Sequence, residues 1–167
     1  MKGILYIEFN VDNKGVFVAE VLTHEGDGHG FEREVMGHTV YDVDPKLRCD
    51  WVHNLREGFE RVRERQHHLN WNPRRPKTDL GWSLFHAVSS KLRRKGDLLM
   101  FDAVGTVLDF RWGVDCWFEC GNRIATVDLT VSRTKHHFKA HFLVRRVDFL
   151  WNRHYGVGRA IARKLSQ

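Results

Sequence analysis

The sequence is short of the residues and runs that define several protein classes. It holds 3 cysteines and 3 prolines in 167 residues. So small and odd a cysteine number argues against a disulfide framework and fits a reducing compartment. No apolar run approaches the ~20 residues of a membrane-spanning helix, and Glu8 and Asn10 interrupt the apolar start too early for a signal peptide. We therefore expect a cytoplasmic protein with no membrane contact.

Zinc-site spacing is missing as well. No standard finger or His-Glu-x-x-His pattern relates the histidines, which include His24, His29, His38, His67, His68, His136, His137 and His141. We interpret them as exposed side chains or as neighbours of bound phosphates. Cys116 and Cys120 could join histidines on zinc, and burial as small apolar residues is the simpler interpretation.

Basic residues outnumber acidic ones, and the two kinds are unevenly spread. The chain has 27 Lys and Arg against 21 Asp and Glu, a net charge of +6. Residues 1–44 carry 3 basic and 9 acidic side chains, whereas 45–100 carry 13 and 6, and 101–167 carry 11 and 6. A basic body of this kind is typical of proteins that meet phosphate backbones. We expect a nucleic acid as the partner, with DNA favoured over RNA.

The pattern along the chain predicts a single α+β domain over residues 1–167. Residues 1–44 read as an acidic N-terminal β section, with antiparallel strands at 3–9 and 15–22 around the turn Asp12–Gly15 and a third strand at 31–41. A homo-oligomer or a protein partner that docks through this section stays open.

Residues 45–167 read as a basic α/β core. Asp44 and Pro45 favour a helix start, and apolar residues then recur every three or four positions to about residue 68. Thr78 or Asp79 caps a second helix that ends before Gly96. The remaining predicted elements are strands at about 98–104, 112–120, 123–132 and 140–149, and a helix at 156–165.

The most informative stretch is the hairpin around Gly121-Asn122, which has the form of a two-residue turn. Pairing Cys120 with Arg123 places Asp115 opposite Asp128. Carboxylates directly opposite on adjacent strands lie ~5 Å apart and repel each other. A divalent cation removes that cost, and oxygen ligands at this spacing suit Mg²⁺ or Mn²⁺.

Gly113-Val114-Asp115 and Asp128-Leu129-Thr130 together resemble the paired motifs of the PD-(D/E)xK nuclease superfamily. The resemblance covers roughly residues 79–149. It implies a restriction-endonuclease-like mixed sheet flanked by helices, and an endonuclease with a magnesium or manganese cofactor. Thr130 stands where the superfamily has lysine, and Lys135 is the candidate substitute. Residues 133–139 also leave little room for the helix that usually follows.

The resemblance implies roles for individual residues. Asp115, Asp128 and Lys135 are the candidate catalytic residues, and Asp109, Asp115 and Asp128 the candidate metal ligands. Glu57, Glu60 and Glu64 are alternatives to Asp109 as the third acid. Six residues are candidates for binding phosphates: Arg74, Arg75, Lys77, Arg133, His136 and Lys139.

Two other functions fit the same sequence. A non-catalytic nucleic-acid-binding protein could keep the nuclease-like fold and the basic surface without the lysine. A protein-interaction or structural protein could instead use its acidic N-terminal section to dock on a partner. Trp71 and Trp82, which flank the basic loop 70–77, could stack on unpaired bases or pack in the core.

Overall fold

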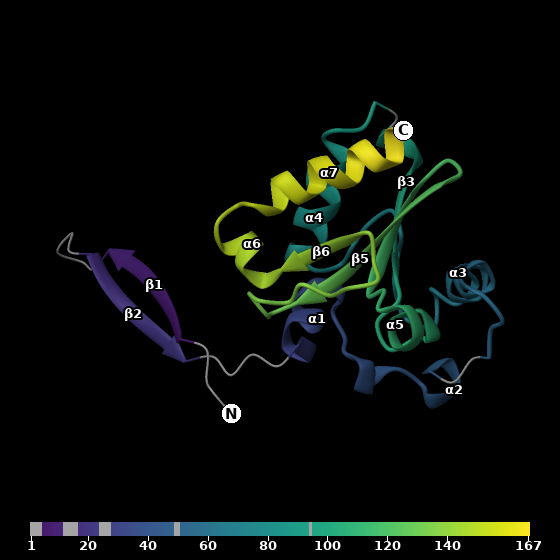
Figure 1. Cartoon of the computed structure of the whole chain (residues 1–167), viewed down its shortest axis with the longest axis horizontal. Coiled ribbons are helices and arrows are strands. Elements are labelled where there is room, and N and C mark those ends of the chain that lie inside the picture. Colours follow the sequence, from purple (N-terminus) through teal and green to yellow (C-terminus); the bar gives the residue numbers. More distant parts are fainter. Residues whose placement is uncertain (1–4, 12–16, 24–27, 49–50, 94) are drawn as a thin grey trace.

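The computed structural model describes residues 5–11, 17–23, 28–48, 51–93 and 95–167. Within these ranges the chain is an α+β protein with a four-stranded mixed sheet flanked by helices (Figure 1). The elements are β1 (Leu5–Val11), β2 (Phe17–Thr23), α1 (Gly28–Met36), η1 (Val40–Asp42), α2 (Pro45–Arg48), α3 (Leu55–Glu64), α4 (Asp79–Ser89), η2 (Lys95–Asp97), β3 (Leu98–Asp102), α5 (Val107–Trp112), β4 (Cys116–Cys120), β5 (Arg123–Thr130), β6 (Phe142–Arg145), α6 (Arg146–Leu150) and α7 (His154–Ser166). No helix in the described ranges has the length and apolar character to cross a membrane.

The N-terminal section differs from the predicted antiparallel β section. β1 and β2 pair antiparallel, with Leu5 opposite Thr23, and the predicted turn at 12–15 lies outside the described residues. The third strand predicted at 31–41 is wrong, because this stretch forms α1 and the short 3₁₀ helix η1. Phe31, Val35 and Met36 share one face of α1 and are buried in the core with α4 and β5. Burial of that face favours the helix.

The long helix predicted at 45–68 is two helices. Its start is as predicted, since the Asp44 carboxylate accepts a hydrogen bond of 2.8 Å from the backbone N–H of Lys46 at the beginning of α2. A new helix, α3, begins after Asn54, whose side chain accepts from the backbone N–H of Glu57 at 3.0 Å. Trp51, one of the apolar residues that recur every three or four positions in the predicted helix, is 88 % exposed between the two helices. The cap at Asn54 therefore begins a separate helix, α3, where one continuous helix was predicted.

The central sheet has the strand order β3-β4-β5-β6. β3, β4 and β5 are antiparallel neighbours, and β6 runs parallel to β5. The hairpin register is as predicted, with Cys120 opposite Arg123 and Trp117 opposite Thr126. The predicted strand at 112–120 begins only at Cys116, because residues 107–112 form α5 between the cap Thr106 and Gly113, which has φ +61°. The predicted strand at 140–149 likewise divides into β6 and α6.

Both faces of the sheet are covered by helices. One face packs against α1, α4 and α7, and Met100, Phe118 and Val127 are buried there. The other face packs against α3 and α5, where Trp117 is buried and its ring lies 5.1 Å from that of Phe59. The two-residue alternation of a strand predicts a polar face shared by Asp115, Trp117 and Glu119, and the burial of Trp117 corrects this prediction. Several carboxyl groups gather at the end of the sheet between α1 and α5.

Candidate functional site

Asp115 and Asp128 meet at this end of the sheet, although not by the predicted pairing of two strand residues. Asp115 lies one residue before β4, and its backbone N–H donates to the carbonyl of Val127 at 2.9 Å. Its carboxylate Oδ2 accepts from the backbone N–H of Leu129 at 2.6 Å. Asp128 lies on β5, and both aspartates are buried. The side chain of Asp115 thus reaches the backbone of β5 beside Asp128.

Asp109 joins these two residues from α5. Its carboxylate Oδ2 accepts from the backbone N–H of Gly105 at 2.8 Å, and the side chain also meets that of Asp115. The helix therefore aims the carboxyl group at the sheet end. Of the acids considered in the sequence, Asp109 is the one that the structure brings to Asp115.

A fourth acid, Glu32 on α1, was not predicted. Its charge acts on both Asp109 and Asp115, and its carboxylate Oε2 lies 3.3 Å from Nδ1 of His29. The spacing of Phe31 and Val35, four residues apart, is the sequence signal that could have indicated a helix with Glu32 in it. We call the group of four residues Glu32, Asp109, Asp115 and Asp128 the carboxyl cluster.

Crowding in the carboxyl cluster changes its proton affinities. Burial raises the pKa of Asp115 well above its usual range, and the charges of Asp109, Asp128 and Glu32 raise it further, against the hydrogen bond from Leu129. Burial also raises the pKa of Asp109 and of Asp128. All three raised pKa values show that the ionised carboxylate is disfavoured at this site. Binding of a proton or of a cation would relieve that cost.

Lys135 is the cation that the structure places in the carboxyl cluster. Its Nζ lies 2.6 Å from Oδ2 and 2.9 Å from Oδ1 of Asp128. Lys135 comes from the connection 131–141 between β5 and β6, and its carbonyl accepts from the Arg145 guanidinium at 3.2 Å. Thr130, where the resemblance noted in the sequence would place a lysine, is buried and accepts from the backbone N–H of Ser132. The ammonium that contacts Asp128 therefore belongs to Lys135, five residues beyond Thr130 in the sequence.

The donor chemistry of the carboxyl cluster fits a hard divalent cation. Carboxylate oxygens are the ligands that Mg²⁺ and Mn²⁺ prefer, and buried acids gain most from a cation's charge. Among the described side chains, however, no three or more His, Cys, Asp or Glu are arranged to hold one metal ion. Both oxygens of Asp128 face Lys135 instead. A metal would therefore require Asp128 to share or exchange that partner.

The other acids considered for the site lie elsewhere. Glu57 and Glu60 on α3 form ion pairs with Arg61 and Arg56, each four residues away along the helix. Such i, i+4 pairs are typical of a solvated helix face. Glu64, on the same helix, is exposed.

No protein-family model, curated protein or solved structure matches this chain.

The predicted phosphate-binding residues fall into two loops. Arg133, His136 and Lys139 are exposed on the connection that carries Lys135, and Lys139 Nζ donates to the carbonyl of Arg111 at the end of α5, at 3.2 Å. Their loop therefore lies beside the carboxyl cluster. The second set is exposed on the loop 70–77 between α3 and α4, and consists of Arg74, Arg75 and Lys77.

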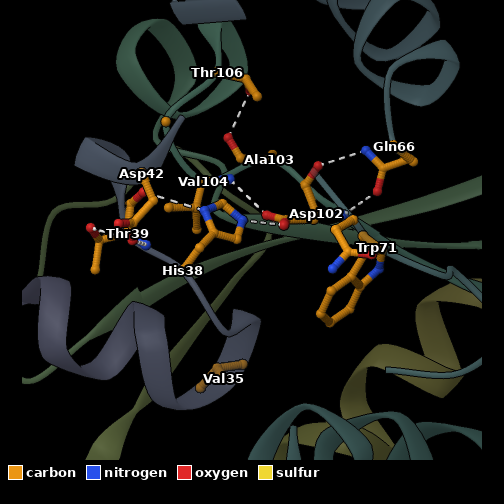
Figure 2. Close-up of polar contacts among 12 residues, drawn as sticks. Val35, His38, Thr39, Asp42, Gln66, Trp71, Asp102, Ala103, Val104 and Thr106 are labelled. Atoms are coloured by element: carbon orange, nitrogen blue, oxygen red, sulfur yellow. Dashed lines mark hydrogen bonds and ion pairs between the residues drawn. The ribbon is translucent and has the colours of Figure 1, made fainter. Parts of the chain in front are cut away.

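A second polar centre, not predicted from the sequence, joins the end of α1 to β3 (Figure 2). His38 is buried, its Nε2 faces Oδ2 of the fully buried Asp102, and its Nδ1 lies 3.3 Å from the carbonyl of Thr39. Burial alone would lower the pKa of His38, but hydrogen bonding to Asp102 and the charge of that carboxylate raise it overall. Burial raises the pKa of Asp102.

Both imidazole nitrogens of His38 face oxygen acceptors, so the pair must hold one proton between Nε2 and Oδ2 while Nδ1–H serves Thr39. The remaining groups around Asp102 are also paired. Val104 N–H donates to its other carboxylate oxygen at 3.0 Å, and Gln66 bonds both the N–H and the C=O of its backbone. Both ring nitrogens of His38 are thus engaged, and the residue links the segment after α1 to β3.

Proposed function

We propose that the chain is a metal-dependent nuclease that hydrolyses phosphodiester bonds of DNA or RNA, on a restriction-endonuclease-like fold. The observation that carries this proposal is the carboxyl cluster with Lys135 on Asp128. Like charges in such proximity cost stability, and groups of this kind concentrate at sites of chemistry. The α+β architecture and the hairpin that presents Asp128 support the same interpretation.

Asp115 and Asp128 would hold the Mg²⁺ or Mn²⁺ ion, with assistance from Asp109. A bound divalent ion supplies Lewis-acid polarisation of a phosphoryl oxygen and activation of water. Lys135 stabilises the ionised form of Asp128, and its ammonium offsets negative charge that develops on a phosphate at the cluster. Burial of Asp115 removes competing water and strengthens these electrostatic interactions.

The exposed basic residues would position the substrate. Arg133, His136 and Lys139 share a loop with Lys135, so a phosphate backbone bound there passes the carboxyl cluster. Contacts of this kind fix orientation without reading the base sequence. The +6 net charge implies binding that weakens steeply between about 50 and 300 mM salt, through loss of counterion release.

The test is cleavage of end-labelled DNA and RNA, single- and double-stranded, with Mg²⁺, with Mn²⁺ and with a chelator. The expected result is cutting that the chelator stops and that Asp128→Asn abolishes, because the substitution removes a metal ligand. Asp97→Asn, an exposed acid in η2, is the matched control and should cut normally. Absence of cutting with every ion and substrate would refute the nuclease proposal.

A non-catalytic nucleic-acid-binding protein is the second candidate. Two observations favour it: Thr130 occupies the lysine position, and the described acids do not already form a three-ligand metal set. Such a protein would bind nucleic acid in a salt-sensitive manner and would leave the strand uncut. Neither divalent ions nor Asp128→Asn would change that result. Salt-sensitive binding without cutting would select it.

A further inference from the structure

A groove of about 1120 Å³ lies at the loop 70–77 and the first turns of α4. Its lining combines aromatic and basic side chains, with one acid, Asp79, at the start of α4. Three cations line it, and these are Arg74, Arg75 and Lys77. An excess of positive charge beside aromatic rings is the combination that recognises polyanions carrying flat rings.

The loop that forms the groove is held in place by β3, an edge strand of the described sheet. The indole N–H of Trp71 donates to the carbonyl of Met100 at 2.7 Å, and the backbone N–H of Met100 donates to the carbonyl of Pro73 at 2.8 Å. Trp71 is buried and forms the floor of the groove. The cavity is thus preorganised, which lowers the entropic cost of binding.

Trp82 is the exposed aromatic side chain of the groove. It is 47 % exposed, and its ring lies 5.7 Å from that of Phe85 at an interplanar angle of 16°. The stacked contact with the buried Phe85 fixes the indole, while the exposed part is free to meet a ligand in the groove. A rigid, half-exposed indole suits stacking on a second flat ring.

Two of the cations, Arg74 and Lys77, are anchored by hydrogen bonds to backbone carbonyls. Arg74 donates from Nη1 to the carbonyl of Gly96 at 2.7 Å, and Lys77 Nζ donates to the carbonyl of Asn70 at 3.3 Å. Both partners are uncharged, and an ammonium has three donors, so capacity for an anion remains. Arg75 lies between them and is exposed.

We propose that this groove binds an unpaired stretch of nucleic acid, with a base stacked on Trp82 and the adjoining phosphates on Arg74, Arg75 and Lys77. Stacking of neighbouring base pairs covers the faces of the bases inside a duplex, so an indole stacks most readily on an unpaired base. This inference adds to the proposed function that the nucleic acid is single-stranded where it meets the groove. It rests on the proposed function only in treating the bound strand as a substrate.

The experiment measures fluorescence anisotropy of labelled oligothymidylate and of a hairpin duplex, with a chelator present so that cutting cannot interfere. Trp82→Ala should weaken oligothymidylate binding by about tenfold or more, the usual contribution of one stacked base. Trp82→Phe should restore most of the affinity. Trp151→Ala, at a tryptophan that is 58 % exposed and outside the groove lining, should leave the affinity unchanged.

Arg75→Ala provides a second measurement that loss of folding would not imitate. It should reduce the slope of log affinity against log salt by about 0.7, as expected for one lost phosphate contact on a single strand. Circular dichroism of each variant checks that the fold is retained.

Different outcomes separate this proposal from the nuclease proposal. Equal affinities of the Trp82→Ala and Trp151→Ala variants for oligothymidylate would overturn the groove assignment, as would tighter Trp82-dependent binding of polyglutamate, which would indicate an acidic protein segment as the ligand. Trp82-dependent binding without cutting by any divalent ion would support the groove and refute the nuclease. Failure of the wild type to bind any nucleic acid would overturn both.

Discussion

Because His38 and Asp102 share a proton, we expect His38→Leu to destabilise the fold much more than Asp102→Asn. His38→Leu leaves the fully buried Asp102 carboxyl without its charged partner, and loss of one member of a buried ion pair costs about 3–5 kcal/mol. Asp102→Asn keeps the shape and places an amide donor opposite Nε2 of a neutral imidazole. Nδ1–H continues to serve Thr39, so we expect this variant to lose only about 1 kcal/mol, the value of a typical hydrogen-bond change.

The pH dependence follows from the directions of the pKa shifts. In the wild type the raised pKa of His38 stabilises the fold below its ordinary value of 6.5, and this contribution is lost as pH rises through the folded-state pKa. In His38→Leu the raised pKa of Asp102 destabilises the fold as pH rises above the ordinary value of 3.8. The cost of His38→Leu should therefore increase from pH 4 to neutral pH, as the unpaired Asp102 carboxyl is driven to ionise.

Urea unfolding followed by tryptophan fluorescence measures both effects. A loss of 3–5 kcal/mol corresponds to a fall of about 10 °C in Tm for a chain of this length. Equal losses for His38→Leu and Asp102→Asn, or a cost of His38→Leu that does not change with pH, would refute the shared-proton assignment.

Three further predictions concern other parts of the chain. Gly158→Ala should destabilise the fold by about 1–3 kcal/mol, because an added Cβ would lie 2.7 Å from the backbone of Ala87. Gly156→Ala in the same helix is the control: its Cβ would meet nothing within 4 Å, so it should stabilise the fold by a few tenths to about 1 kcal/mol. Thermal unfolding measures both. Asn54→Ala should cost about 1 kcal/mol, measured by urea unfolding, through loss of the α3 cap, and an unchanged midpoint would contradict that role. Lys135→Ala should lose most of the cleavage rate while keeping nucleic-acid binding, and normal cutting would remove Lys135 from the proposed chemistry.

The elements that the sequence predicted well are those specified by local signals. Gly121, with φ +63°, forms the tight hairpin loop, and this loop fixes the register that brings Asp128 beside β4. Thr78 caps α4 through a hydrogen bond from the N–H of Gly81, as its place before an apolar helical pattern indicated. In both cases the determining residues lie within a few positions of the element.

The elements that the sequence missed depend on distant partners. The segment that forms α5 lay mostly between the strands predicted at 98–104 and 112–120 and was given no helix, although Thr106 and Gly113 mark the two ends of one. The pair His38 and Asp102 could not be seen in the sequence because 64 positions separate them. Glu32 was placed in a strand, so its contribution to the carboxyl cluster was also missed. Tertiary burial decides such cases.

Residues 28–42 contact both the carboxyl cluster and other parts of the core. The sequence had instead predicted that this stretch belongs to an acidic β section apart from the basic core. Glu32 extends the cluster from the first turns of α1, and Glu34 pairs with Arg146 at 2.7 Å. Just beyond the helix, His38 is linked to β3 through Asp102, and an added Cβ at Gly37 would lie 2.6 Å from Cε of Lys77, a residue of the groove. α1 therefore contacts the carboxyl cluster through Glu32 at its middle, and the segment that begins α4 at its C-terminal end, where Thr78 donates to the carbonyl of Val35. Any change that shifts α1 should affect both sites together, because the two contacts lie on one continuous helical backbone.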